Sequence, residues 1–318
     1  MRARQQILRL LRDRAAQASL LFLLSVSVAA LLAGALAIDP LRQDVARMLE
    51  GPSGDFWFGS DELGRDILAR VLYGARTSLL TAAGAVSIAA LVGVPIGLVA
   101  GFFGGWRDTL LMRVVDLLLA LPAILLAMAL IAVLGRSQLT ALVSVGMTGI
   151  PAFARVTRAQ VLSLKSRDFV TAVEAFGGTS RYIMFRTVLP NAWSPILVQC
   201  VVLSSVAILL EAALSFLGVG IPPPTPSWGE MLRTGKSYLY EAPTYAVLPG
   251  LALTLTILSL DSIGRAIPTT PGTSTPKNRS IILRWLKATW CSPTTMPSSP
   301  WHSSTSIEHR PTISCECR

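Results

Sequence analysis

Apolar residues dominate this chain in six stretches, which polar or proline-rich segments separate. The stretches cover residues 15–38, 77–106, 117–135, 137–154, 191–218 and 246–260, and the helix of the last one is expected to end near Ile267. An apolar helix of about 20 residues crosses the roughly 30 Å hydrocarbon core of a bilayer. The pattern therefore predicts an all-α polytopic membrane protein with six transmembrane helices.

The first apolar stretch has two interpretations. Five arginines precede it, and Ala35-Leu36-Ala37 near its end fits the cleavage site of a secretory signal peptide. Its length exceeds that of a typical signal-peptide apolar region, which favours a retained membrane anchor. Both interpretations place the N-terminus in the cytoplasm and the next segment outside.

A basic polar segment, residues 155–190, follows the fourth apolar stretch. It carries six Lys and Arg residues against only Asp168 and Glu174. Because Lys and Arg accumulate in cytoplasmic loops, the charge places this segment inside, and four spans counted from a cytoplasmic N-terminus agree. The six spans then predict that both termini are cytoplasmic.

Within this segment the residues predict two short helices. Asp168 is a candidate N-cap for a helix over 169–176, which the glycines at 177–178 would end. Thr179 or Ser180 would cap a second helix, which we expect to end before Pro190. A long loop that carries its own capped helix favours docking to another protein over an ordinary solvated loop.

The spacing over 171–190 resembles the coupling loop of bacterial ABC-importer permeases, which reads E-A-A, three residues, Gly, nine residues, I-x-L-P. Thr171-Ala172-Val173, Gly177 and Thr187-Val188-Leu189-Pro190 occupy the three slots. In that family the helix of this loop lies in a cleft of the ATP-hydrolysing subunit. The resemblance and the capping pattern assign coupling to Asp168, Ala172, Glu174, Ala175, Gly177, Leu189 and Pro190.

A second resemblance lies in the polar segment after the first stretch. G-S-D-E-L-G-R-D at 59–66 resembles the G-T-D-x-x-G-R-D segment of dipeptide, oligopeptide and nickel permeases, specifically the second subunit of the pair. The matching positions are Gly59, Asp61, Gly64, Arg65 and Asp66. Residues 211–220, E-A-A-L-S-F-L-G-V-G, match the same permeases. Without the resemblance, 59–66 would be a solvated loop that leads into an amphipathic helix.

The resemblance covers roughly residues 55–260 and implies the type I ABC-importer permease fold in the bacterial plasma (inner) membrane. It implies a heterodimer with a second permease subunit, two ATP-binding subunits and an extracytoplasmic substrate-binding protein. ATP and Mg would bind to the ATPase subunits, so this chain is expected to bind no cofactor and to carry no catalytic residue. The implied cargo is di- or oligopeptides, with nickel chelates or glutathione as alternatives.

Composition narrows the class of protein. Of the 318 residues, 52% are hydrophobic and 14% charged, against about 25% charged in soluble domains. The net charge of +10 could suggest nucleic acid, but the arginines flank the apolar stretches and act as topology signals, so no nucleic-acid partner is expected. A secondary transporter or channel that needs no ATPase remains an alternative. A membrane enzyme is disfavoured because both histidines lie beyond residue 268.

Three details inside the apolar part bear on packing and transport. Glu211 is an acid within an apolar stretch, which makes it a candidate for the transport pathway, with a polar contact between helices as the alternative. Gly93, Gly97 and Gly101 recur every four residues and predict a close-packing face, while Pro95 predicts a kink.

The segment E-M-L-R-T-G-K-S at 230–237 is close to the phosphate-binding pattern G-x-x-x-x-G-K-[ST]. Glu230 replaces the first glycine, and no strand precedes the segment. We therefore expect no nucleotide binding there, and an ATPase on a separate chain.

Three segments organise the chain. Residues 1–76 hold the N-terminal cytoplasmic segment, the first helix and an extracytoplasmic loop. Residues 77–267 form the permease core, with five helices and the coupling loop. Residues 268–318, rich in Ser, Thr and Pro, depart from the family pattern, so we expect a frameshifted or altered, disordered tail. Its His and Cys residues fit no usual zinc spacing, so no metal site is expected.

Overall fold

The computed structural model describes residues 13–33 and 39–267. The predicted cleavage site at 35–37 and the predicted tail lie outside these residues.

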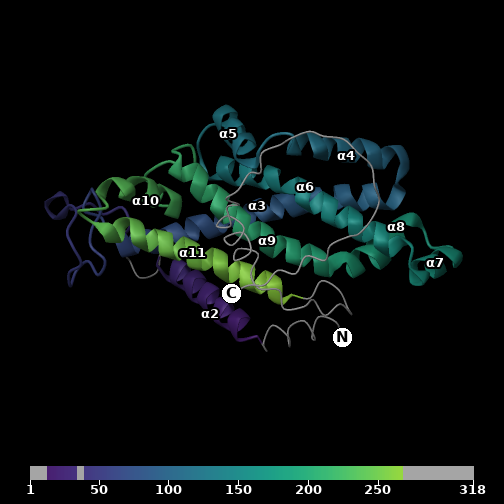
Figure 1. Cartoon of the computed structure of the whole chain (residues 1–318), viewed down its shortest axis with the longest axis horizontal. Helices are drawn as coiled ribbons and strands as arrows, with labels where there is room; N and C mark the ends of the chain where they lie inside the picture. The colour runs from purple at the N-terminus through teal and green to yellow at the C-terminus, as the bar shows by residue number, and fades with distance from the viewer. Residues whose placement is uncertain (1–12, 34–38, 268–318) are drawn as a thin grey trace, which may run out of the picture. The chain divides into compact units, whose positions relative to one another are not determined.

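The described chain is helical almost throughout (Figure 1). The α-helices are α2 (Arg14–Leu32), α3 (Ile67–Phe103), α4 (Gly105–Leu119), α5 (Ala123–Leu134), α6 (Gln138–Lys165), α7 (Asp168–Ala175), α8 (Ser180–Tyr182), α9 (Leu189–Phe216), α10 (Trp228–Gly235) and α11 (Pro243–Ala266). Two short 3₁₀ helices, η1 (Val45–Arg47) and η3 (Lys236–Tyr238), and one π-helical segment, η2 (Ile183–Val188), complete the set. Within the described residues, five helical runs are long and apolar enough to cross a membrane: α2, α3, α6, the run from α8 to α9, and α11.

The predicted third span, 117–135, is not one straight helix. The structure has α4 and α5 there, bent by 85°, and the count reaches six spans only if this pair is taken as one. The break falls just before Pro122, which precedes α5, because proline disfavours the helical conformation of its predecessor. Arg107 and Arg113 lie within α4.

Two of the long helices extend beyond their apolar stretches. α3 starts ten residues before the predicted span and passes through Pro95 without a break. α6 continues to Lys165 instead of ending near 154, so the first part of the basic segment is helix. A hydropathy pattern identifies only the part of a helix that lies in lipid. It does not detect the polar residues by which the helix extends beyond that part.

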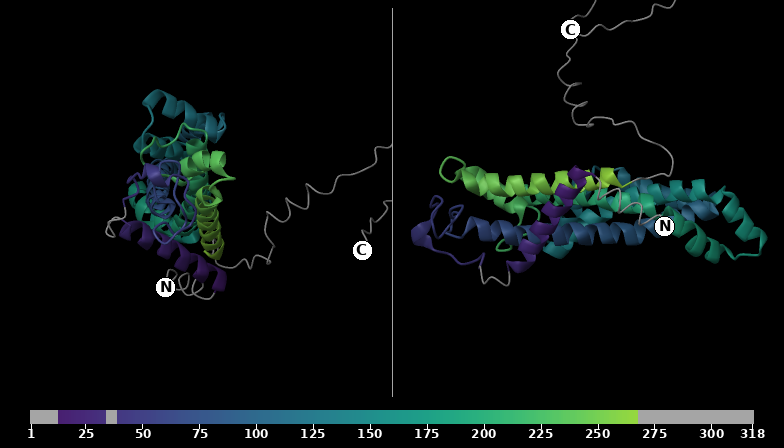
Figure 2. Two further views of the ribbon diagram at one scale, coloured as in Figure 1. Left: turned by 90° about the vertical axis from the view of Figure 1, so that its left-hand side faces the viewer. Right: turned by 90° about the horizontal axis from the view of Figure 1, so that it is seen from below.

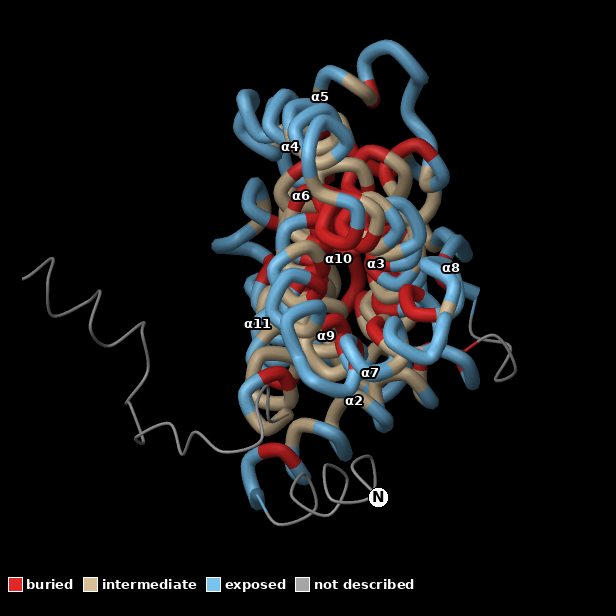
Figure 3. Tube along the Cα trace, turned by 90° about the vertical axis from the view of Figure 1, so that its right-hand side faces the viewer, coloured by how far each residue is buried: buried red, intermediate tan, exposed pale blue. Residues whose placement is uncertain are grey.

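The helices α3 and α6 pack at backbone distance along the predicted glycine face. A Cβ added at Gly97 would lie 2.3 Å from the carbonyl oxygen of Ala154, and one added at Gly93 would lie 2.7 Å from that of Ile150. Only a residue without a side chain fits there, which confirms the predicted close-packing face. Buried residues gather in the middle of the bundle, where α3, α6 and α9 meet (Figure 3).

The helix that begins at Ser180 does not end before Pro190, contrary to the prediction. It passes through η2 directly into α9, and Pro190 is the second residue of α9. Proline has no N–H to donate, and the helix changes from π to α type at Leu189, directly before this proline.

Two candidate functional segments lie at opposite ends of the bundle. The loop 39–66 and α10 occupy one end, and α7 with α8 occupies the other (Figures 1 and 2).

Candidate functional site

The helix α7 begins one residue earlier than predicted, at the residue that was expected to cap it. Arg167 is the N-cap residue, and Asp168 is the first helical residue. There its carboxylate interacts favourably with the positive end of the helix dipole. α7 ends where the glycines predicted: Gly177 has φ +81°, and its N–H donates to the carbonyl oxygen of Glu174 at 2.9 Å. Gly178 then donates to the carbonyl oxygen of Val173 at 3.0 Å, so the last carbonyls of the helix are satisfied.

One face of α7 is packed against the ends of longer helices. Val170, only 3% exposed, belongs to a buried cluster that draws residues from α3, α6 and η2. The other members are Leu98, Phe102, Val161, Ile183, Met184 and Val188. A displacement of α7 therefore acts directly on three other helical elements.

The opposite face of α7 is exposed and carries both small and aromatic residues. Ala172, Glu174 and Ala175 are exposed, as their predicted docking role requires. Phe169 is 41% exposed and Phe176 is 92% exposed. Sequence reasoning missed these two aromatic residues, although their three- and four-residue spacing from Ala172 places them on its side of the helix.

The last two residues assigned to coupling lie apart from this exposed face. Leu189 is partly buried and packs against the cluster beneath α7. Pro190 is exposed at the start of α9. The structure thus gives Leu189 a supporting position rather than a place on the surface.

Two basic residues expected to mark topology also fasten α6 to its neighbours. Arg158 donates from Nε and Nη2 to the two carboxylate oxygens of Asp108 on α4, each at 2.6 Å. Lys165 Nζ donates to the carbonyl oxygen of Phe102 at 2.8 Å, which satisfies the end of α3.

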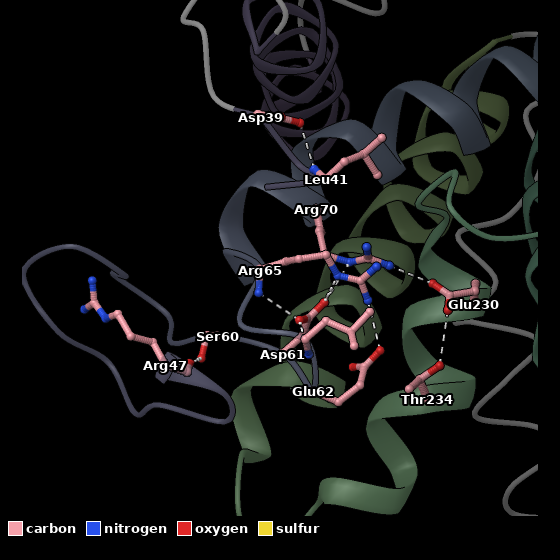
Figure 4. A network of polar contacts seen from close by, with 11 residues as sticks. Asp39, Leu41, Arg47, Ser60, Asp61, Glu62, Arg65, Arg70, Glu230 and Thr234 are labelled. Atoms are coloured by element: carbon pink, nitrogen blue, oxygen red, sulfur yellow. Dashed lines mark hydrogen bonds and ion pairs between the residues drawn. The ribbon is translucent and has the colours of Figure 1, made fainter. Parts of the chain in front are cut away.

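At the opposite end, the segment 59–66 forms a tight loop around a buried carboxylate. Asp61 Oδ1 accepts from the backbone N–H groups of Leu63 and Arg65, both at 2.9 Å, and Oδ2 accepts from Arg65 Nε at 2.6 Å (Figure 4). Gly64 has φ +69°, and a Cβ there would lie 1.8 Å from the carbonyl oxygen of Asp44, so only glycine fits.

The same loop starts α3. Asp66 is its N-cap residue and accepts from the N–H of Leu68 at 2.9 Å, while its partial burial raises the pKa of the carboxyl group. Gly59 has φ +86° and its carbonyl oxygen accepts from Ile67, the first residue of the helix. All five matching positions therefore have a role in the turn, and Arg65 contributes its backbone N–H as well as its side chain.

Arg70 connects this loop to α10. Its Nε lies 3.3 Å from Asp61 Oδ2, and its Nη2 donates to Glu230 Oε2 at 3.0 Å. Glu230 Oε1 accepts from Thr234 at 3.2 Å (Figure 4). Sequence reasoning missed Arg70 because an arginine in a polar segment is expected to lie in solvent. In the structure Arg70 is only 1% exposed.

Glu211 lies between helices. It is 1% exposed and accepts from Ser78 on α3 at 3.0 Å and from Ser215 on α9 at 2.9 Å. Glu211 thus makes the polar contact between helices that the sequence allowed as one alternative. Its role in the transport pathway stays a prediction.

The segment 230–237 folds as α10 and η3 rather than as a loop around a phosphate. Among the residues that the structure describes, no group of three or more His, Cys, Asp or Glu residues is placed to hold a metal ion.

Comparisons with known proteins find a matching family profile and several similar proteins. Residues 93–269 match the family profile of the binding-protein-dependent transport system inner membrane component. The chain is 42% identical to the dipeptide transport system permease protein DppC of Alkalihalophilus pseudofirmus, over 68% of this chain and 71% of that protein. It is 40% identical to the di/tripeptide transport system permease protein DppC of Pseudomonas aeruginosa, over 79% and 86%.

Other relatives are named for the transport of a different solute. The chain is 40% identical to the glutathione transport system permease protein GsiD of Escherichia coli O6:K15:H31, over 80% of this chain and 84% of that protein. Among solved structures, an inward-facing MetNI methionine ABC transporter matches with a TM-score of 0.50 at 18% identity, over 64% of this chain and 98% of the matched chain. This likeness shows a shared fold.

Proposed function

The chain belongs to the binding-protein-dependent transport system inner membrane components, and from this premise we propose that α7 couples an ATPase to the import of small peptides. The protein is a multi-pass membrane permease subunit of an ABC importer. Its own contribution is mechanical, because a permease changes shape while the ATP chemistry takes place on another chain. We accordingly assign it no catalytic residue.

One observation carries the coupling proposal: α7 has a buried face and a bare face. Val170 fastens the first to α3, α6 and η2, while Phe169, Ala172 and Phe176 leave the second open. A helix held this way passes a push on its bare face to the transmembrane helices. Large aromatic side chains at the centre of an interface commonly contribute most of its binding energy.

The partners in the proposal are those of a binding-protein-dependent importer. They are a second permease subunit as heterodimer partner, two ATP-binding subunits that hold ATP and Mg, and an extracytoplasmic binding protein. α7 and the loop 39–66 lie at opposite ends of the bundle, as contact with an ATPase inside and a binding protein outside requires (Figure 2). In this orientation both termini lie in the cytoplasm, and the protein itself lies in the bacterial inner membrane.

The cargo we propose is a di- or tripeptide. Support comes from the two relatives named for dipeptide or di/tripeptide transport, which are 42% and 40% identical. Glutathione is the second candidate, because GsiD relatives reach 40% identity.

Uptake in a strain that lacks this gene tests the whole proposal. We expect loss of uptake of radiolabelled L-alanyl-L-alanine, restored by the intact gene, and an equal loss when the ATPase genes are deleted instead. Uptake that persists without the ATPases would support a secondary transporter and overturn the proposal. Glutathione uptake in the same strains decides between the two cargos.

A further inference from the structure

A pocket of about 630 Å³ opens at the end of the bundle that carries α10. Its walls come from the loop 59–66, from the end of α9 and from α10 with η3. Pockets for small molecules typically measure about 300–1,000 Å³, so the space suits a small solute rather than a folded domain.

Two cations on one helical face line this pocket. Lys236 and Ser237 follow Arg233 by three and four residues along α10 and η3, and all three contribute to the wall. Residues at these spacings are neighbours on a helix surface. Lys236 Nζ also lies 4.9 Å from the centre of the Phe216 ring, which holds the ammonium beside an apolar surface.

Two carboxylates, Glu62 and Glu230, also line the pocket, and Glu62 Oε2 is buried without a hydrogen-bond partner. Glu230 binds Arg70 and Thr234, and Glu62 pairs with Arg65 at 2.9 Å. Over the residues that the structure describes, neither Arg233 nor Lys236 forms an ion pair. The three cations of the lining, Arg65, Arg233 and Lys236, outnumber its two carboxylates, and the positive excess at Arg233 and Lys236 attracts an anion.

We propose that this pocket binds the carboxylate of a small peptide, with Arg233 and Lys236 as its two ligands. An arginine fork and an ammonium together match a carboxylate, the group that every unblocked peptide carries at its C-terminus. A phosphate loop would use free backbone N–H groups, whereas α10 and η3 engage their backbone within the helix. Phe216 and Tyr238 supply an aromatic wall for the side chains of the solute.

The choice of a peptide rests on the function proposed above, while the site itself can be tested without transport. The full chain, in nanodiscs together with its permease and ATPase partners but without the binding protein, is titrated with radiolabelled L-alanyl-L-alanine in equilibrium dialysis. We expect saturable binding at millimolar concentration. The C-terminal amide of the dipeptide should fail to compete, and the N-acetyl dipeptide should compete.

Two pocket variants are compared with one control variant. Arg233→Gln and Lys236→Gln should each weaken binding about ten-fold, as loss of one charged hydrogen-bond partner does. Arg42→Gln removes an exposed cation of the same end outside the pocket and should bind as the wild type does. Equal thermal unfolding of all variants shows that the fold is intact.

Several results would overturn the inference. They are no saturable binding, equal binding of the C-terminal amide, equal competition by inorganic phosphate, and unchanged binding in Arg233→Gln and Lys236→Gln. In a separate co-purification with the binding protein added, loss of that protein by the two variants with unchanged dipeptide binding would make the pocket a protein-docking site. If one of these results is found while the wild type takes up the dipeptide normally, the pocket inference alone fails and the proposed function holds.

Discussion

Arg70 on α3 and Glu230 on α10 form a buried ion pair, with Nη2 and Oε2 3.0 Å apart, although 160 positions separate them in the sequence. Arg70 is 1% exposed and Glu230 is 5% exposed. The pair joins the loop 59–66, through Asp61, to the helix that lines the pocket. Because each charge is buried, each depends on the other for its stability in the fold.

Removal of one partner should therefore destabilise the protein strongly. We expect Glu230→Gln or Arg70→Met to cost about 3–5 kcal/mol, the range found when one half of a buried pair is deleted. The measurement is thermal unfolding of the detergent-solubilised protein, followed by size-exclusion chromatography.

Two controls separate pairing from the mere loss of a side chain. The double variant Arg70→Met with Glu230→Met should be more stable than the worse single variant, because no unpaired charge then remains between these two positions. Arg76→Met removes an exposed arginine of the same helix and should leave the unfolding temperature nearly unchanged. A double variant less stable than both singles would contradict this account.

The contact between α3 and α6 gives a second prediction. Gly97→Ala would place a Cβ 2.3 Å from the backbone oxygen of Ala154, which cannot move away alone. Overpacking of this kind costs about 1–3 kcal/mol, and we expect a lower membrane abundance by immunoblot. Gly84→Ala on the same helix is the control, because its nearest atom at 2.2 Å belongs to the flexible Leu142 side chain. Equal abundance of the two variants would argue against the close helix contact.

The apolar pattern predicted the long helices well and their ends poorly. Five helical runs lie where the stretches are, because burial in lipid requires an unbroken apolar helix. The start of α3 escaped prediction because Arg70 is charged yet buried, and only its distant partners explain that. The bend between α4 and α5 was also missed, although Pro122 marks its place.

The candidate coupling site was partly predictable. Spacing placed α7 and its end at Gly177, because glycine favours the left-handed conformation that ends a helix. The orientation of α7 was not predictable, since it depends on residues as distant as Leu98. For the same reason the exposed Phe176 emerged only from the fold.

Topology gives a third prediction. A reporter fused after Arg158 should be cytoplasmic, and one fused after Asp66 extracytoplasmic, because α7 and the loop 59–66 lie at opposite ends of the bundle. Paired alkaline phosphatase and fluorescent protein fusions measure this. Both reporters on one side of the membrane would refute the proposed orientation.

The bare face of α7 gives a fourth prediction. Phe176 is 92% exposed, so Phe176→Ala removes little from the fold and should leave membrane abundance unchanged. If Phe176 anchors the ATPase, its loss should weaken co-purification of the ATPase subunits about ten-fold or more. Tyr240→Ala, at an equally exposed aromatic residue near η3, is the control and should not affect the ATPases. An equal effect of both variants would mean that general surface hydrophobicity, not docking, is being measured.

Gly177 gives the last prediction, which isolates the shape of the chain at the end of α7. At φ +81° no atom lies within 4 Å of an added Cβ, so any effect of substitution comes from the backbone rather than from a clash. A β-branched residue is strongly disfavoured at positive φ, and strain of this type costs about 1–3 kcal/mol. Gly177→Val should therefore displace the end of α7 and reduce peptide uptake, with membrane abundance unchanged.

Asparagine at the same position provides the matched control. Asn is several-fold enriched among non-glycine residues with positive φ, so Gly177→Asn should keep the turn although it adds a larger polar group. Uptake and ATPase co-purification should then be impaired in the valine variant and largely retained in the asparagine variant. This result would show that the backbone conformation, and not the size of the side chain, determines coupling. If Gly177→Val transports at the wild-type rate and abundance, α7 is not the coupling element. If both variants fail equally, the glycine is needed for close contact with the ATPase, and the conformation of the turn is not what limits coupling.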